Sequence, residues 1–178
     1  MLRNLLGERF HLATHTESRE LPGYALSMSG NKPKFQESTG PAAPANDGAP
    51  PDLKLGPDRY FVPPDRQGVF FQLTGMGSAR SVFRQVTMRE LASNLQARLK
   101  RPVSDATGLA AKYDFILSYA TEGLDLGGGR LLVGPGGEEN APDIFSALKE
   151  QLGLKLEARK VSADVIVIDH IEKVPTGN

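Results

Sequence analysis

A unit that recurs three times constrains the fold of this chain more than any other feature of its sequence. In residues 2–28, 88–119 and 144–171, an apolar-striped helical segment is followed by a short break and then by two segments of alternating apolar and polar residues. Apolar residues at helical spacing predict an amphipathic helix, and strict alternation predicts a half-buried strand. Because none of these units can bury its apolar face alone, we expect them to pack together and share a sheet.

The predicted architecture is therefore a single α+β domain over residues 1–178. Its repeated helix-hairpin (αββ) units place the helices against one face of a largely antiparallel sheet. Two subdomains separated by the proline-rich stretch are the alternative. The pattern is compatible with one continuous sheet or with two.

Two stretches rich in proline or glycine interrupt the units. Between Gly30 and Gly68 lie eight of the thirteen prolines, and between Gly123 and Gly137 lie seven of the nineteen glycines. Such composition buries too little apolar surface to offset the entropy lost when the backbone is ordered. We expect mobile excursions at about residues 31–67 and 121–140, with short strands at 69–73 and 131–133.

The second and third helices have the clearest boundaries. Thr87 followed by Glu90 is a capping box, in which each side chain bonds a backbone N–H at the helix start, so the second helix should begin at Met88. The third should have Pro142 at its first position and end before Gly153. The residues predicted to form the buried face of the second helix are Met88, Leu91, Leu95 and Leu99.

The outer units are less sharply bounded. In the first, the helix should end near Gly7 and be followed by strands at residues 10–16 and 21–28, with Pro22 near the start of the second strand. In the last, the strand at residues 165–168 is apolar on both faces, which is typical of a central position in a sheet. That strand should be the most protected in the protein.

Composition excludes several classes of function. Lys plus Arg and Asp plus Glu both number 21, so no global field steers the chain towards nucleic acid. The chain has no cysteine, which removes disulfides and thiolate metal sites. Leu2, Leu5 and Leu6 are interrupted by polar residues, so we predict no signal peptide in this chain. No segment approaches the roughly 20 apolar residues of a membrane span.

Four segments resemble a known family. They read MLRNLLGERFHLATHTESRELPGYAL at residues 1–26, RPVSDATGLAAKYDFILSY at 101–119, IFSALKEQLGLKLEARK at 144–160 and VIVIDHIEKV at 165–174. In this order they are similar to a soil-associated bacterial family of unknown function, DUF3738. The chain departs from the family pattern at Gly7 and at Ala110 and Ala111.

The resemblance implies a secreted or periplasmic setting, because members of that family usually carry a signal peptide and a further stretch ahead of the segment that starts here. Some are fused to membrane-bound sensor metallopeptidases. The chain therefore looks like the C-terminal part of such a protein or a shortened member. The family supplies no functional residue that can be transferred to this sequence.

The candidate binding residues are His11, His15, Asp114 and His170. His11 and His15 lie four apart in a predicted strand, about 13 Å from each other, so one metal ion cannot take both. Asp169 and His170 are adjacent and point to opposite faces of a strand, so they form no dyad. We predict no catalytic residue, no metal site and no cofactor.

The leading hypothesis is a non-enzymatic, extracytoplasmic binding or protein-interaction module. Its partner would be a protein or peptide that pairs with a free strand edge, and it would not be a nucleic acid. One alternative is a hydrolase or peptidase-associated domain whose site gathers the histidines and Asp114. A purely structural domain is the other.

Overall fold

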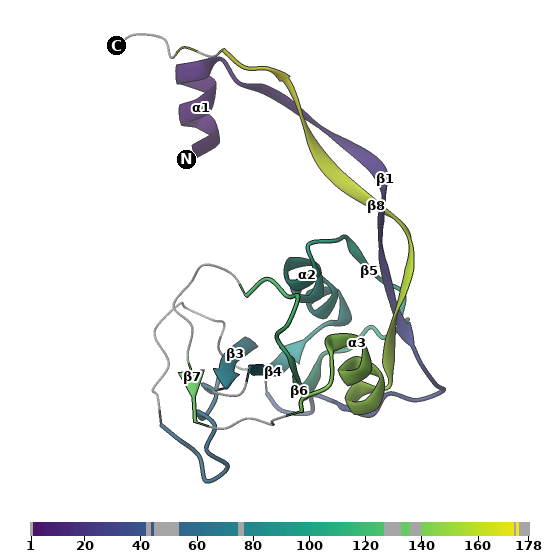
Figure 1. The fold of residues 1–178 in the computed structure, drawn as a ribbon. Coiled ribbons are helices and arrows are strands. Elements are labelled where there is room, and N and C mark those ends of the chain that lie inside the picture. Colours follow the sequence, from purple (N-terminus) through teal and green to yellow (C-terminus); the bar gives the residue numbers. More distant parts are fainter. Residues whose placement is uncertain are drawn as a thin grey trace.

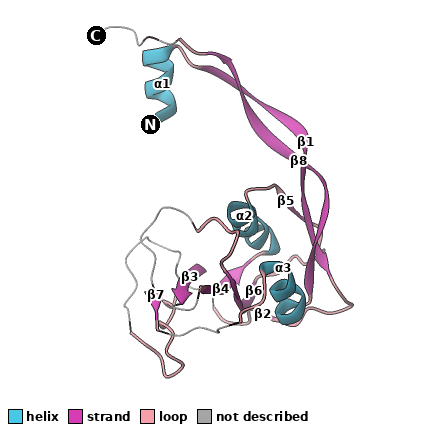
Figure 2. Cartoon of the chain, viewed as in Figure 1, coloured by secondary structure: helices cyan, strands magenta, loops and turns pink. Residues whose placement is uncertain are grey.

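The protein consists of a body and a long arm (Figures 1 and 2). The computed structural model describes residues 2–41, 44, 54–74, 77–126, 133–135, 140–172 and 174. The body contains a five-stranded sheet and two helical segments, and the arm is a two-stranded ribbon that carries a third helix at its far end. The fold is α+β and rich in strands.

The five-stranded sheet of the body has the order β2-β6-β4-β3-β7. All neighbouring strands are antiparallel except β3 and β7, which are parallel. The strands are β2 (Gln36–Glu37), β3 (Gly68–Thr74), β4 (Ser78–Val86), β6 (Tyr113–Ala120) and β7 (Val133–Gly134).

The second sheet joins the two ends of the chain. β1 (Ala13–Met28) pairs antiparallel with β8 (Leu154–His170) from the Ala13–His170 pair to the Met28–Leu154 pair. The short β5 (Val103–Asp105) pairs parallel with β1 at the body end, which gives the order β5-β1-β8. The ribbon is therefore anchored to the body at one end only.

The core lies between the five-stranded sheet and the helices. α2 (Met88–Leu99) buries Met88, Leu91 and Leu95 against the inward residues of β4 and β6. α3 (Ile144–Ala147) continues as the π-helical turn η1 (Leu148–Leu152), whose leucines join the same cluster. Phe83 of β4 stacks on Phe115 of β6 with ring centroids 4.6 Å apart.

The predicted start of α2 is confirmed. The Glu90 backbone N–H donates to the Thr87 hydroxyl (3.3 Å), and the Thr87 backbone N–H donates to the Glu90 carboxylate (2.7 Å). Gly153 follows η1 and ends the α3–η1 segment in a left-handed conformation (φ 69°), as predicted. Pro142 lies outside α3, however, because Asp143 caps it by accepting bonds from the backbone N–H groups of Phe145 and Ser146.

We expect Thr87→Ala to lower the free energy of unfolding by about 0.5–2 kcal/mol, because the backbone N–H of Glu90 loses the Thr87 hydroxyl as its acceptor. Chemical denaturation measures this loss. Ser93→Ala is the control, since the Ser93 hydroxyl only donates to the Arg89 carbonyl within the same helix (3.0 Å). Equal losses in both variants would contradict the assigned cap.

The repeated αββ pattern is wrong. α1 (Leu2–Phe10) runs through Gly7, and β1 then continues without a turn over the region predicted to hold two strands. The two strands of the second unit, β5 and β6, belong to different sheets. The third unit has one 17-residue strand, β8. Pairing between the chain's two ends replaces the local hairpins, and local alternation could not reveal it.

The predicted excursions fall partly outside the described residues, which omit 42–43, 45–53, 127–132 and 136–139. Residues 54–67, which are described, contain one bridge between Leu55 and Phe61. The strand predicted at 69–73 is confirmed as β3.

The part of the ribbon beyond the body is called the outer arm, meaning residues 13–22 of β1 and 160–170 of β8. The hydrophobic core cluster of the described chain contains no residue from 2–23 or 157–172. Ile166 and Ile168 are 74% and 59% exposed. The prediction that residues 165–168 form the most protected strand is therefore wrong, because β8 is an edge strand whose isoleucine face is exposed, while Val165 and Val167 on the other face are only half-buried.

Candidate functional site

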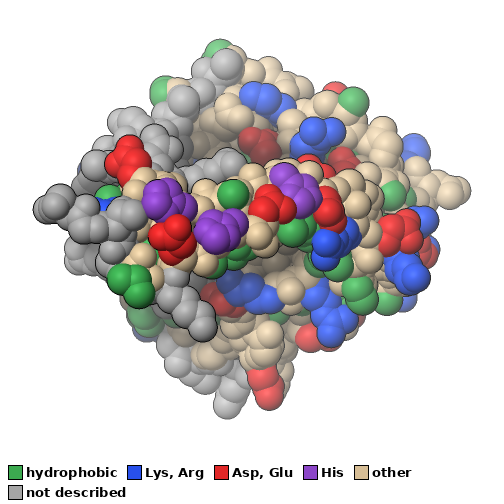
Figure 3. All heavy atoms as spheres, turned by 90° about the horizontal axis from the view of Figure 1, so that it is seen from above, with side chains coloured by type: hydrophobic (Ala, Val, Ile, Leu, Met, Phe, Trp, Pro, Cys, Tyr) green, Lys and Arg blue, Asp and Glu red, His purple; other side chains and the backbone are tan. Residues whose placement is uncertain are grey.

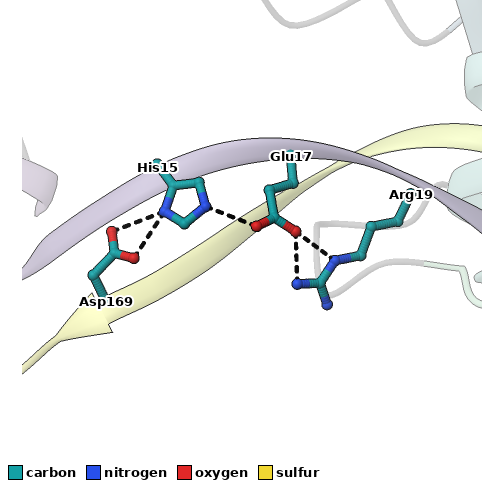
Figure 4. Close-up of polar contacts among 4 residues, drawn as sticks. All are labelled: His15, Glu17, Arg19 and Asp169. Atoms are coloured by element: carbon teal, nitrogen blue, oxygen red, sulfur yellow. Dashed lines mark hydrogen bonds and ion pairs between the residues drawn. The ribbon is translucent and has the colours of Figure 1, made fainter.

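All three histidines lie on or next to the outer arm, where they alternate with acidic side chains (Figure 3). His15 of β1 lies opposite Val167 of β8 and reaches diagonally across the ribbon to Asp169, at the irregularity of the ladder (Figure 4). When protonated, its imidazole donates from Nδ1 to both Asp169 oxygens (2.8 and 2.9 Å) and from Nε2 to Glu17 (2.9 Å). Glu17 in turn accepts from Arg19 (2.7 Å), which completes a row of four charged groups.

These contacts shift the pKa values of His15 and Glu17. The hydrogen bond to Asp169, followed by that to Glu17, raises the pKa of His15 above its ordinary value of 6.5. The bonds from His15 and Arg19 lower the pKa of Glu17. Protonated His15 thus stabilises the fold fully below its ordinary pKa, and this stabilisation is lost as the pH rises through the raised value. The stabilisation by ionised Glu17 is present above its ordinary pKa and is lost as the pH falls through the lowered value.

We expect Asp169→Asn to lower the pKa of His15 towards 6.5, because the largest cause of the upward shift is removed. An NMR titration of the imidazole measures the midpoint directly. Asp164→Asn is the matched control, since Asp164 lies on the opposite face of the same strand. A His15 midpoint that does not move in Asp169→Asn would contradict the pairing.

The other two histidines gather around one carboxylate at the tip. His11 Nδ1 lies 2.9 Å from Glu172, and His170 Nε2 lies 3.9 Å from the same oxygen. His11 follows α1 in a left-handed conformation (φ 45°), so it lies outside β1 and the predicted strand spacing from His15 does not apply. Within the described residues, no three His, Asp or Glu side chains are arranged to hold a metal ion.

Asp114 lies on the other sheet and has a structural task. Its carboxylate accepts a hydrogen bond from the backbone N–H of Gln85 (2.6 Å). Gln85 lies in an irregularity of the β4–β6 ladder and has a positive φ of 50°. Asp114 therefore satisfies a backbone donor that the bulge removes from the regular ladder.

Two surface grooves flank Asp114, each of about 510 Å³. One is bordered by Lys34, Glu37 and Gln151, and the other by Asp65 and Arg84. Neither contains a histidine. The four candidate residues are thus divided among the arm tip (His11 and His170), the outer arm (His15) and the body (Asp114), and they do not form one site.

β8 has an open strand edge. The sequence predicted that a free edge would exist but did not indicate which strand would have it. β8 is the last strand of its sheet, and within the described chain it pairs with β1 alone. The opposite edge, on β1, is covered by β5 near the body and interrupted by Pro22, which has no N–H to offer. Between Val161 and Ile168, β8 contains no proline, glycine or lysine that would discourage pairing.

In the body sheet, the edge of β6 that faces away from β4 is covered by other parts of the chain. The side chain of Gln151 accepts a bond from Ser118 N–H (2.9 Å) and donates to Ser118 C=O (2.7 Å), so it takes the place of a neighbouring strand. Ala120 N–H donates to the Pro142 carbonyl (2.8 Å) further along. β2 covers the other end of β6.

Comparison with known proteins agrees with the motifs at both ends of the chain. The model of the family "Protein of unknown function (DUF3738)" matches residues 1–171. The chain belongs to the DUF3738 family. No curated protein and no solved structure matches it.

The match includes the whole of β1 and β8, so the ribbon lies within the DUF3738 region of the chain. None of the described helices combines the length and hydrophobicity that a membrane-spanning helix requires. The sequence signal for the open edge was the run Val165, Ile166, Val167 and Ile168, which is apolar on both faces. This run predicts that its side chains are buried, and an interface with another chain can bury them as well as a hydrophobic core can.

Proposed function

We propose that this DUF3738 chain is a protein-interaction module that accepts an extended partner strand along the outer edge of β8. The observation that carries the proposal is the open edge of the outer arm, with Ile166 74% exposed beside it. Addition of a strand to a sheet edge provides main-chain hydrogen bonds for affinity and side-chain contacts for specificity.

The energetics of the arm support this proposal. A two-stranded ribbon alone in water is marginally stable, whereas three or more strands with a hydrophobic face are stable. The outer arm contributes nothing to the core cluster of the described chain, and Val161, next to the body, is the one residue of 13–22 and 160–170 that is buried. The body therefore compensates little for the entropy of ordering the arm. A partner strand would complete a three-stranded sheet and cover apolar side chains on both faces.

The hydrolase alternative has less support. Both nitrogens of His15 face carboxylates, which leaves neither directed at a substrate, and the histidines border neither groove beside Asp114. A purely structural domain would not need an exposed apolar arm. The extracytoplasmic setting is part of the proposal and is supported by the family resemblance.

A peptide library displayed on phage tests the proposal with extended sequences as probes. We expect selected peptides to bind the native chain and to protect the amides of residues 161–168 from hydrogen exchange. Replacing both Ile166 and Ile168 with lysine should abolish binding, because charged edge residues oppose strand addition. Thr16→Lys is the matched control, since Thr16 is exposed opposite Ile166 but lies on β1.

Two results would overturn the proposal. One is peptide binding that survives the double lysine variant, or the absence of any selectable peptide. The other is esterase or peptidase turnover by the native chain that disappears when His11, His15 and His170 are all changed to alanine, which would favour the hydrolase alternative.

A further inference from the structure

We infer that the strand accepted by β8 is the β8 strand of a second copy of this chain, in antiparallel orientation. This inference rests on the proposed function and names the partner of the same edge. The product is a symmetric dimer in which the β1–β8 ribbons of two copies form a four-stranded sheet with the order β1-β8-β8-β1. Two-fold pairing of this kind requires a surface that is complementary to itself.

The charge distribution along β8 provides that complementarity. The half nearer the body carries the basic residues Lys155, Arg159 and Lys160 with a single acid, Glu157, and the half nearer the tip carries the acids Asp164 and Asp169. Parallel pairing would place like charges side by side, which destabilises a cross-strand pair. Antiparallel pairing places each basic half against the acidic half of the other copy.

Symmetry also selects a register. A two-fold axis perpendicular to the ribbon keeps each face on the same side of the joined sheet, so each residue must oppose one of the same parity. The register centred on Ser162 places Lys160 opposite Asp164, and it also places Lys155 opposite Asp169. Registers centred one residue to either side provide neither pair.

The side chains in this register are suited to the contact. Lys160 and Asp164 are exposed, and neither has an ion-pair partner among the described residues, so the register depends on this pair. Lys155 already pairs with Glu157 (2.7 Å) and Asp169 with His15 (2.8 Å). Ile166 and Ile168 would lie opposite Ala158 and Leu156 of the other copy, on the same face of the sheet. The most exposed isoleucines of the arm would thus be covered by apolar side chains next to the other copy's body.

Sedimentation equilibrium of the full chain tests the inference. We expect the native chain to dimerise, and Lys160→Asp or Asp164→Lys to weaken the dimer at least about tenfold, because each reversal opposes like charges at two symmetric positions. The double variant Lys160→Asp with Asp164→Lys restores both pairs and should return to within about threefold of the native dimer. Glu20→Lys, an equal charge change on β1 opposite Ser162, should leave the dimer unchanged.

The outcomes separate this inference from the proposed function. A native chain that stays monomeric at its highest soluble concentration, or a dimer that is indifferent to both charge reversals, overturns self-pairing. If selected peptides still bind the β8 edge of that chain, the interaction module stands without the dimer. If they do not, both proposals fall. Recovery of the dimer in the double variant would support the register itself, since misfolded single variants would not be rescued.

Discussion

Leu95→Ala is expected to lower the free energy of unfolding by about 2–5 kcal/mol, the largest effect that we predict for a single substitution. Leu95 is only 1% exposed and lies in the cluster formed by α2, β4 and β6. Truncation removes its buried methyl groups and leaves a cavity that closely packed neighbours cannot fill completely. Urea denaturation monitored by circular dichroism gives the value.

Leu5→Ala is the matched control for Leu95→Ala. Both are leucines in helices, but Leu5 lies in α1 at the tip of the arm and is 51% exposed. Its replacement should change the free energy of unfolding by no more than about 0.5 kcal/mol. Comparable losses at the two positions would mean that α1 belongs to the cooperative core.

Gly23→Ala is expected to cost about 1–3 kcal/mol, because the new methyl group would overpack the joint between arm and body. A Cβ at Gly23 would collide with the carbonyl oxygen of Pro102. That carbonyl accepts a hydrogen bond from the backbone N–H of Tyr24 (2.8 Å). In the variant, β1 and the segment before β5 must therefore move apart, which weakens or breaks this hydrogen bond.

Thermal unfolding combined with hydrogen exchange at Tyr24 measures both consequences of Gly23→Ala. Gly30→Ala is the control, since a Cβ there meets no atom within 4 Å. Loss of stability without faster exchange at Tyr24 would place the strain elsewhere than at this joint.

Local sequence signals predicted the elements whose determinants are local. The cap at Thr87, the alternation of β6 and the terminating Gly153 each depend on residues a few positions apart, and all three are confirmed. β1 and β8 depend on each other over more than a hundred residues. Alternation identified their strand segments, but it could not show that each continues as one long strand on an exposed arm.

The surroundings of the candidate site residues could not be predicted either, because they too depend on contacts between residues far apart in the sequence. His15 was selected from the sequence, but its main partner, Asp169, lies 154 positions away and was considered only as a neighbour of His170. Asp114 was selected as a lone acid in a strand, and its task depends on a bulge in β4 that no pattern predicted. Pairing across the ribbon is what gives both residues their surroundings.

The placement of the ribbon's ends also determines how the arm would respond to mechanical force. Ala13 and His170 form the outermost pair of the β1–β8 ladder, at the tip and far from the body (Figure 1). A load that pulls these residues apart acts on one cross-strand pair at a time, so the ladder opens like a zipper from the tip inward. Tension on the arm would therefore expose the β8 strand progressively while the core between α2 and the five-stranded sheet stayed folded.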